Sequence, residues 1–385
     1  MEIKQVYDFA NKAFQQAVGD SVLLNEDLSN VVAMGDAVLN ANAMDKYVDA
    51  LVNHIGRVVV IDRVYQGVLA SLQKDGWTFG SVMEKISITM PKAEENESWE
   101  LTDGAVYEEN QFYKPQVSAK FFNKMTTFEI PISITEKQVR QSFTNQMQLG
   151  SFIAGIYTAL ENALTIRIEE LSRRAINNMI AETIYADYQG ASLGSKSGVR
   201  AINLLYEYNQ TVPTPLSLND AKVSEDYWKF AFGRMALMKG RLASMNTLFN
   251  IEGKERFTPE DRLHFVMLSD ASILPQIYLE SSTFHNNLIS LKGYEEIPYW
   301  QGVGTSYAFD DVSAIKVTSV GGHSVDASGI IACMFDDDCV LITNQNRRVT
   351  SKWNAKAEFT NYWYKVDGSY LNDAQEQFIV FFMAE

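Results

Sequence analysis

Cysteine and histidine are scarce in this chain, which limits the chemistry that its side chains can support. The two cysteines, Cys333 and Cys339, flank an acidic turn at 335–338. We expect two free buried thiols in a reducing cytoplasm, with a disulfide across the turn as the alternative. Zinc sites need matched ligand spacing. The histidines stand singly, so we predict no metal site and no cofactor; they are His54, His264, His285 and His323.

Long apolar runs and an excess of basic residues are also missing. No stretch of about 18 apolar residues exists, so the sequence predicts no membrane-spanning helix. The segment MEIKQVYDFANKAF is polar and amphipathic, without the apolar core of a secretory signal, and we expect a soluble intracellular protein. The 48 acidic residues outnumber 33 basic ones, for a net charge of −15. Nucleic-acid binding depends on a concentrated basic surface, and this charge argues against it.

The residues that are present describe an ordered globular protein. Hydrophobic residues make up 46% of the 385 positions, enough for a sizeable core and more than one lobe. Low-complexity tracts are absent, with only 8 prolines and 22 glycines. Apolar side chains recur at helical spacing over 28–38, 44–55 and 64–72, so the first 80 residues are predicted to be helical.

From residue 82 the pattern changes to that of a long β excursion. Ile86, Ile88 and Met90 alternate with polar residues, which is typical of a half-buried strand. Residues 91–110 then carry seven acids against one base, with a turn signal at Asp103-Gly104. Strands are predicted over 113–122 and 126–134. The acidic tip is interpreted as having few apolar positions.

This excursion raises the question of what supports it. A lone two-stranded arm is marginally stable in water, so it must pack on a neighbouring lobe or on another subunit. Its acidic outgoing limb and lysine-bearing returning limb suit ion pairs along the arm or across an interface. An ordinary solvated hairpin is the alternative. The predicted intersubunit residues are Glu94, Glu95, Glu97, Trp99, Glu100, Lys114, Lys120 and Lys124.

The strongest periodic pattern follows directly. Apolar residues from Leu149 to Met179 recur in steps of three or four, which predicts one amphipathic helix of about 35 residues, roughly 50 Å long. Glu169–Arg173 and Glu170–Arg174 are favourable pairs on its expected solvent face. Such a length indicates a structural spine.

Residues 216–330 are interpreted as a mixed α/β lobe. A helix is predicted from Asp220 or Ser224 to about Leu248, with four large apolar residues buried: Trp228, Phe232, Met235 and Leu242. Short core strands are predicted over 264–269, 330–335, 340–343 and 378–383. Paired carboxylates at 310–311 and 336–338 suit turns better than acid–base catalysis, and no hydrolase motif is present.

The order of these elements resembles the major capsid proteins of tailed bacteriophages, the Hong Kong ninety-seven fold. The segments that carry the likeness best are 130–136 (IPISITE), leading into the long helix, and 338–342 (DCVLI). The resemblance implies an α+β fold in five regions. These are an N-terminal helical arm (1–82), an extended β loop (83–134), a peripheral domain with the spine helix (135–200), an axial domain (201–329) and terminal strands returning to the peripheral and axial core (330–385).

The resemblance also implies a function. Members of this family self-assemble as pentamers and hexamers into an icosahedral shell around double-stranded DNA, with scaffolding and portal proteins as partners. The implied protein is not an enzyme, encloses DNA without sequence-specific binding, assembles in the host cytoplasm and ends in the virion. A bacterial nanocompartment shell protein and a soluble hydrolase are the alternatives. Lysine–asparagine crosslinks occur in some members, but these residue types are too common here to predict one.

Overall fold

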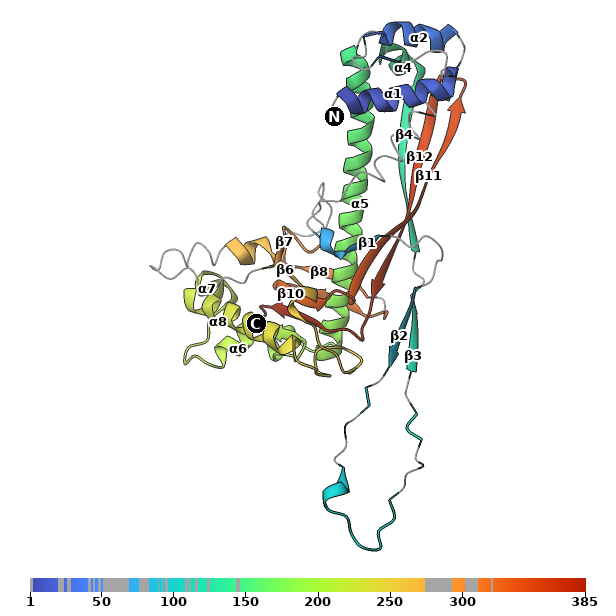
Figure 1. Cartoon of the computed structure of the whole chain (residues 1–385). Coiled ribbons are helices and arrows are strands. Elements are labelled where there is room, and N and C mark those ends of the chain that lie inside the picture. Colours follow the sequence, from blue (N-terminus) through green and yellow to red (C-terminus); the bar gives the residue numbers. More distant parts are fainter. Residues whose placement is uncertain are drawn as a thin grey trace.

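A computed structural model shows an elongated molecule built along one helix (Figure 1). It describes residues 3–19, 24–25, 29–40, 43, 46–47, 50, 69–75, 83–88, 90–91, 93, 96–107, 110, 112–114, 117–122, 125–142, 146–273, 293–301, 311–319 and 321–385. Most of the predicted helical patterns over 44–55 and 64–72 lies outside these residues; within the first, residues 46–47 and 50 are described and are helical. Both helices and sheets are present, which confirms the α+β class.

The spine is helix α5, Gln146–Tyr188, which has 43 residues and a length of about 64 Å. The predicted length of about 35 residues was too short because the periodicity weakens after Met179, where Ile180, Ala181 and Ile184 bury more than one face. The predicted Glu169–Arg173 pair forms at 3.5 Å. Glu170 pairs with Arg167 at 2.7 Å instead of with Arg174.

A four-stranded sheet lies beside the spine, in the order β1-β11-β12-β4. Its strands are β1 (Gln73–Asp75), β11 (Val340–Asn354), β12 (Phe359–Asn372) and β4 (Met125–Thr135). β4 pairs with β12 along its whole length, from Thr135↔Phe359 to Met125↔Ser369. Residues 125–134 therefore belong to the body, although the sequence placed them in the extended loop, because the loop's local pattern does not show a partner strand 230 residues away.

β12 crosses the spine closely at one point. A side-chain carbon added at Gly368 would lie 3.3 Å from Phe128 and 3.4 Å from Leu171. Glycine at this position lets the strand approach α5 without displacing either neighbour. Thus the spine and the sheet form one packed unit here.

The second core, at the far end of the spine, holds the N-terminal helices. Helix α1 (Ile3–Val18) and helix α2 (Val31–Asn40) bury apolar residues against β4, β12 and the first half of α5. Helix α4 (Glu136–Ser142) starts with a capping box, in which the Gln138 amide donates to the Thr135 hydroxyl at 3.3 Å and the Thr135 amide donates to the Gln138 side chain at 3.0 Å.

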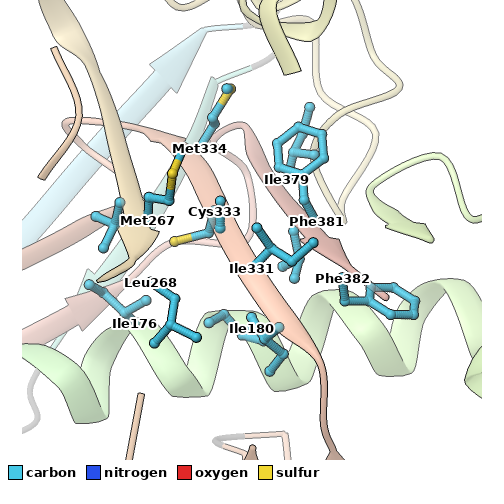
Figure 2. Packing of buried hydrophobic residues seen from close by; sticks show 14 of the residues in the cluster. Ile176, Ile180, Met267, Leu268, Ile331, Cys333, Met334, Ile379, Phe381 and Phe382 are labelled. Atoms are coloured by element: carbon cyan, nitrogen blue, oxygen red, sulfur yellow. The ribbon is translucent and has the colours of Figure 1, made fainter. Parts of the chain in front are cut away.

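The main core surrounds the other half of the spine, as Figure 2 shows in part. A five-stranded sheet in the order β5-β13-β10-β6-β7 packs its apolar side chains, such as Ile331 and Phe382, toward Ile176 and Ile180 of α5. The strands are β5 (Ala201–Asn203), β13 (Phe378–Phe382), β10 (Ile330–Asp336), β6 (Leu263–Leu268) and β7 (Glu295–Ile297). All residues of β10 and β13 are buried, which explains their continuous apolar sequences.

Three helices cover this lobe: α6 (Leu204–Asn209), α7 (Leu218–Val223) and α8 (Glu225–Leu242). α8 begins as predicted, with Ser224 as its N-cap, and buries Trp228, Phe232, Met235 and Leu242. It ends at Leu242 and not near Leu248. A two-stranded sheet, β8 (Ile315–Thr318) with β9 (Ser324–Ala327), and the short 3-10 helices η1 (Ala70–Leu72), η3 (Leu193–Ser195) and η4 (Glu260–Arg262) complete the lobe.

Two expectations about polar residues are settled by packing. Cys333 and Cys339 are free and fully buried, and burial raises the pKa of both thiols. Arg173, expected on the solvent face of the spine, is buried, and its guanidinium carbon lies 4.1 Å from the centre of the Tyr299 ring. The 293–301 segment therefore covers a helix face that looked solvent-exposed in sequence.

Candidate functional site: the protruding arm

A two-stranded arm projects from the body (Figure 1). Its strands are β2 (Met83–Ile88) and β3 (Val117–Phe122), paired antiparallel with each other alone. The segment between them contains the 3-10 turn η2 (Glu97–Trp99) and extends away from the rest of the chain. We call residues 96–107, 110 and 112–114 the tip, and β2 with β3 the stem.

The stem has polar side chains on the face toward the body and apolar side chains on the face toward solvent, which is the reverse of the usual arrangement. On one face, the cross-strand pairs Lys85↔Lys120 and Ser87↔Ser118 are directed toward the body, and the two serine hydroxyls lie 2.7 Å apart. On the other face, four large apolar side chains are 60–62% exposed: Ile86, Ile88, Val117 and Phe121. Burial of apolar surface drives folding, so an isolated subunit would be expected to turn this face inward. The outward face is thus available to a partner.

The tip exposes still more apolar surface. Trp99 is 95% exposed, Val106 91% and Phe112 83%. Leu101, Tyr107 and Tyr113 are also exposed. Local hydrogen bonds shape this segment: the Thr102 amide donates to the Tyr107 hydroxyl at 2.9 Å, and the Ala105 amide donates to the Thr102 carbonyl at 3.1 Å. So many large apolar side chains exposed on one projecting segment indicate a surface that contacts another protein.

At its base, the stem is joined to the body by ion pairs. Lys85 Nζ lies 2.8 Å from Asp373 and 2.7 Å from Glu376, and Lys120 Nζ lies 3.1 Å from Asp373 and 2.7 Å from Glu252. Burial by itself would raise the pKa of Asp373, but the two lysines outweigh that effect, so its pKa is lowered. Burial would lower the pKa of Lys85, yet its carboxylate partners raise it. Lys85, Lys120, Asp373 and Glu252 are therefore charged near neutral pH.

The structure distributes the predicted arm residues between tip and stem. Trp99, Glu100 and Lys114 are exposed on the tip, and the backbone of Glu97 lies in η2. Lys120 lies in the stem and contacts the body, not the acids of the outgoing limb. Glu94, Glu95 and Lys124 lie outside the described residues.

Sequence reasoning missed two parts of this site. The apolar tip residues were visible between the acids at 99–113, but the high density of charge concealed them, and the interpretation of an apolar-poor tip was wrong. The body carboxylates at 252, 373 and 376 carried no local signal, because they lie 132 to 291 residues from the lysines they bind. Only the folded chain brings them together.

The described residues offer no competing site of a familiar kind. Among them, no group of three or more metal-binding side chains is suitably placed for a metal ion. In the part of the chain that the structure describes, no helix is long and apolar enough to cross a bilayer.

Solved structures with a similar fold come from bacteriophages. A chain in the structure of native bacteriophage P68 that includes its head fibre and inner core protein aligns with a TM-score of 0.50 and 10% identity, over 84% of this chain and 86% of that one. A chain of the Staphylococcus phage Andhra capsid aligns with a TM-score of 0.49 and 10% identity, over 85% and 86%. Comparison by sequence with curated proteins found no match.

A long spine helix, a flanking α+β body and a projecting β arm define the fold that this chain shares with a chain of the bacteriophage P68 particle. The chain belongs to the Phi29-like phage major capsid protein family, whose model matches residues 3–382. It is a structural, shell-forming protein of the virion. The resemblance seen in sequence is thereby confirmed, as is the predicted tailed-phage fold.

Proposed function

We propose that this subunit assembles as pentamers and hexamers into an icosahedral shell, and that the arm of each copy docks on a neighbouring copy. The observation that carries this proposal is the exposure of the apolar tip, with Trp99, Val106 and Phe112 each more than four-fifths exposed. A closed ring of identical copies gives each subunit an equivalent neighbour, so one head-to-tail contact between the arm and the next copy can be repeated around the ring. Docking on a second copy would remove this surface from water.

The size of the apolar effect is large enough to control assembly. Burial of one large apolar side chain contributes about 1.5–3 kcal/mol. Trp99, Val106, Phe112 and Tyr113 together would contribute several kcal/mol per arm, against the cost of association. The outward stem face, with Ile86 and Phe121, would add to this contact.

The experiment compares two sets of tip substitutions in the full-length chain. The apolar variant carries Trp99→Ser, Val106→Ser and Phe112→Ser, and the matched control changes polar tip residues, Ser98→Ala and Asn110→Ala. We expect the apolar variant to remain a folded, soluble subunit that no longer forms particles in sedimentation and negative-stain microscopy. The control should assemble normally. Normal shells from the apolar variant, or from a chain lacking residues 91–110, would refute the docking role.

The acidic net charge supports a further part of the proposal: the shell encloses double-stranded DNA without binding it tightly or sequence-specifically. A net charge of −15 supplies no general attraction for phosphate. We propose scaffolding and portal proteins as assembly partners and the host cytoplasm as the place of assembly. We also propose the five regions predicted from sequence as the domain organisation, with β4 (Met125–Thr135) assigned to the body and not to the extended loop. Binding to DNA fragments in a filter or mobility assay should be weak and independent of sequence.

We also propose that the protein has no enzymatic activity. The arrangement nearest to a hydrolase centre places the Ser71 hydroxyl 3.3 Å from His264 Nδ1, with His264 Nε2 3.1 Å from Asp337. The Ser71 hydroxyl donates to Glu295, however, so its proton is not directed to the histidine as a serine nucleophile requires. This geometry supports a structural polar cluster.

A further inference from the structure

The stem contains a like-charge pair that requires compensation. Lys85 and Lys120 are direct cross-strand partners on the body-facing side of β2 and β3. Like charges placed directly opposite each other destabilise a strand pair. Asp373 resolves the conflict from outside the hairpin, because its two carboxylate oxygens lie 2.8 Å from Lys85 Nζ and 3.1 Å from Lys120 Nζ. One body carboxylate thus joins both strands of the arm.

The buried carboxylates of the body also depend on the two lysines for charge compensation. The Asp373 side chain is fully buried, and that of Glu376 is 9% exposed. Glu376 also pairs with Arg256 at 3.0 Å, whereas Glu252 pairs with Lys120 at 2.7 Å. Three carboxylates therefore meet three cations, two of which come from the arm. A buried charge that loses its partner is strongly unfavourable, so the body favours the state in which the stem is bound.

We infer that Lys85, Lys120 and Asp373 form a clamp that sets the direction in which the tip leaves the body. The inference rests on the proposed docking role of the tip. A tip held in one direction is already oriented for its neighbour, and less conformational freedom is lost when two copies meet. The clamp residues are positioning residues: they act on assembly through the arm and not through contact with the neighbouring copy.

Distance measurements in the unassembled full-length subunit test the clamp directly. Spin labels are placed at Ser98→Cys on the tip and Thr247→Cys on the body, both exposed positions. The native Cys333 and Cys339 are 0% exposed, so they do not compete for the label. We expect one narrow distance distribution in the otherwise unchanged chain. Lys85→Gln with Lys120→Gln should broaden this distribution. The fraction of subunits whose stem has separated from the body should rise roughly tenfold for each charged hydrogen bond lost.

Matched variants separate charge from general damage. Lys85→Arg with Lys120→Arg keeps both charges and should restore the narrow distribution, whereas Lys356→Gln, at an exposed position on the body, should leave the distribution unchanged. The glutamine pair should also lower the yield of closed shells. An unchanged distribution in the glutamine pair would overturn the clamp, and a broadened one with normal shell yield would overturn its role in assembly.

The two proposals fail in different ways. If the apolar tip variant assembles normally, the docking role of the tip is wrong, whatever the distance distribution shows. If that variant fails to assemble while the glutamine pair keeps a narrow distance distribution, the docking role is supported and the clamp is refuted.

Discussion

Replacing Leu160 by alanine tests the second core and, with it, the attachment of the N-terminal helices. Leu160 lies in the first half of the spine and is 3% exposed within the cluster that includes Phe14 of α1 and Met34 of α2. The substitution removes three side-chain carbons, each worth about 0.8 kcal/mol when buried. Adding the cavity left behind, we expect the free energy of unfolding to fall by about 3 kcal/mol, within a range of about 2–5.

The assay is urea unfolding of the unassembled subunit, followed by fluorescence and extrapolated to water. Ile166→Ala is the control on the same helix, because Ile166 is 41% exposed and should lose at most about half as much. Amide exchange in α1 and α2 should also become faster in Leu160→Ala, since these helices share the disrupted cluster. A loss below about 0.5 kcal/mol, or unchanged exchange in both helices, would refute the packing described here.

Two further predictions concern single polar residues. Ser224→Ala should lower the free energy of unfolding by about 1 kcal/mol in the same assay, because the serine hydroxyl accepts the Tyr227 amide at the start of α8; Ser224→Asp should retain the cap. Burial by itself lowers the pKa of His264, but Glu295 and Asp337 outweigh it and raise the pKa. The resulting stability is complete below about pH 6.5 and is lost as pH rises through the folded-state pKa. The urea midpoint should therefore decline over this window, and His264→Asn should flatten the decline; equal slopes would contradict this account.

Local patterns predicted the elements whose stability is mainly local or whose burial is complete. The helical period over 149–179 identified the spine, and the apolar runs at 264–269, 330–335 and 378–383 identified β6, β10 and β13. Ser224 marked the start of α8, because a serine hydroxyl caps a helix through its own neighbouring amides.

Long pairings were not predictable in this way. β12 (Phe359–Asn372) was missed, as was most of β11, since one side of each strand is only partly covered and polar residues such as Asn361 and Lys365 interrupt the run. The boundary between loop and body at β4 depended on β12, so it was missed too. Register between strands more than 200 residues apart is decided by packing on the spine.

The candidate site shows the same division. The arm was predicted from sequence, because a two-stranded excursion encloses no core of its own and is only marginally stable alone. The apolar outward face of the stem was not predicted from sequence. The outward direction of Ile86 and Phe121 depends on which stem face contacts the body.

The sequence by itself determined the spine, the core strands, the acidic character and the projecting arm, because periodicity and charge are properties of neighbouring residues. The tertiary structure alone decided that Asp373 meets Lys85 and Lys120, that Arg173 is buried under Tyr299, and that the arm turns its apolar face outward. These contacts join segments up to 288 residues apart, and only the packing of the whole body brings them together.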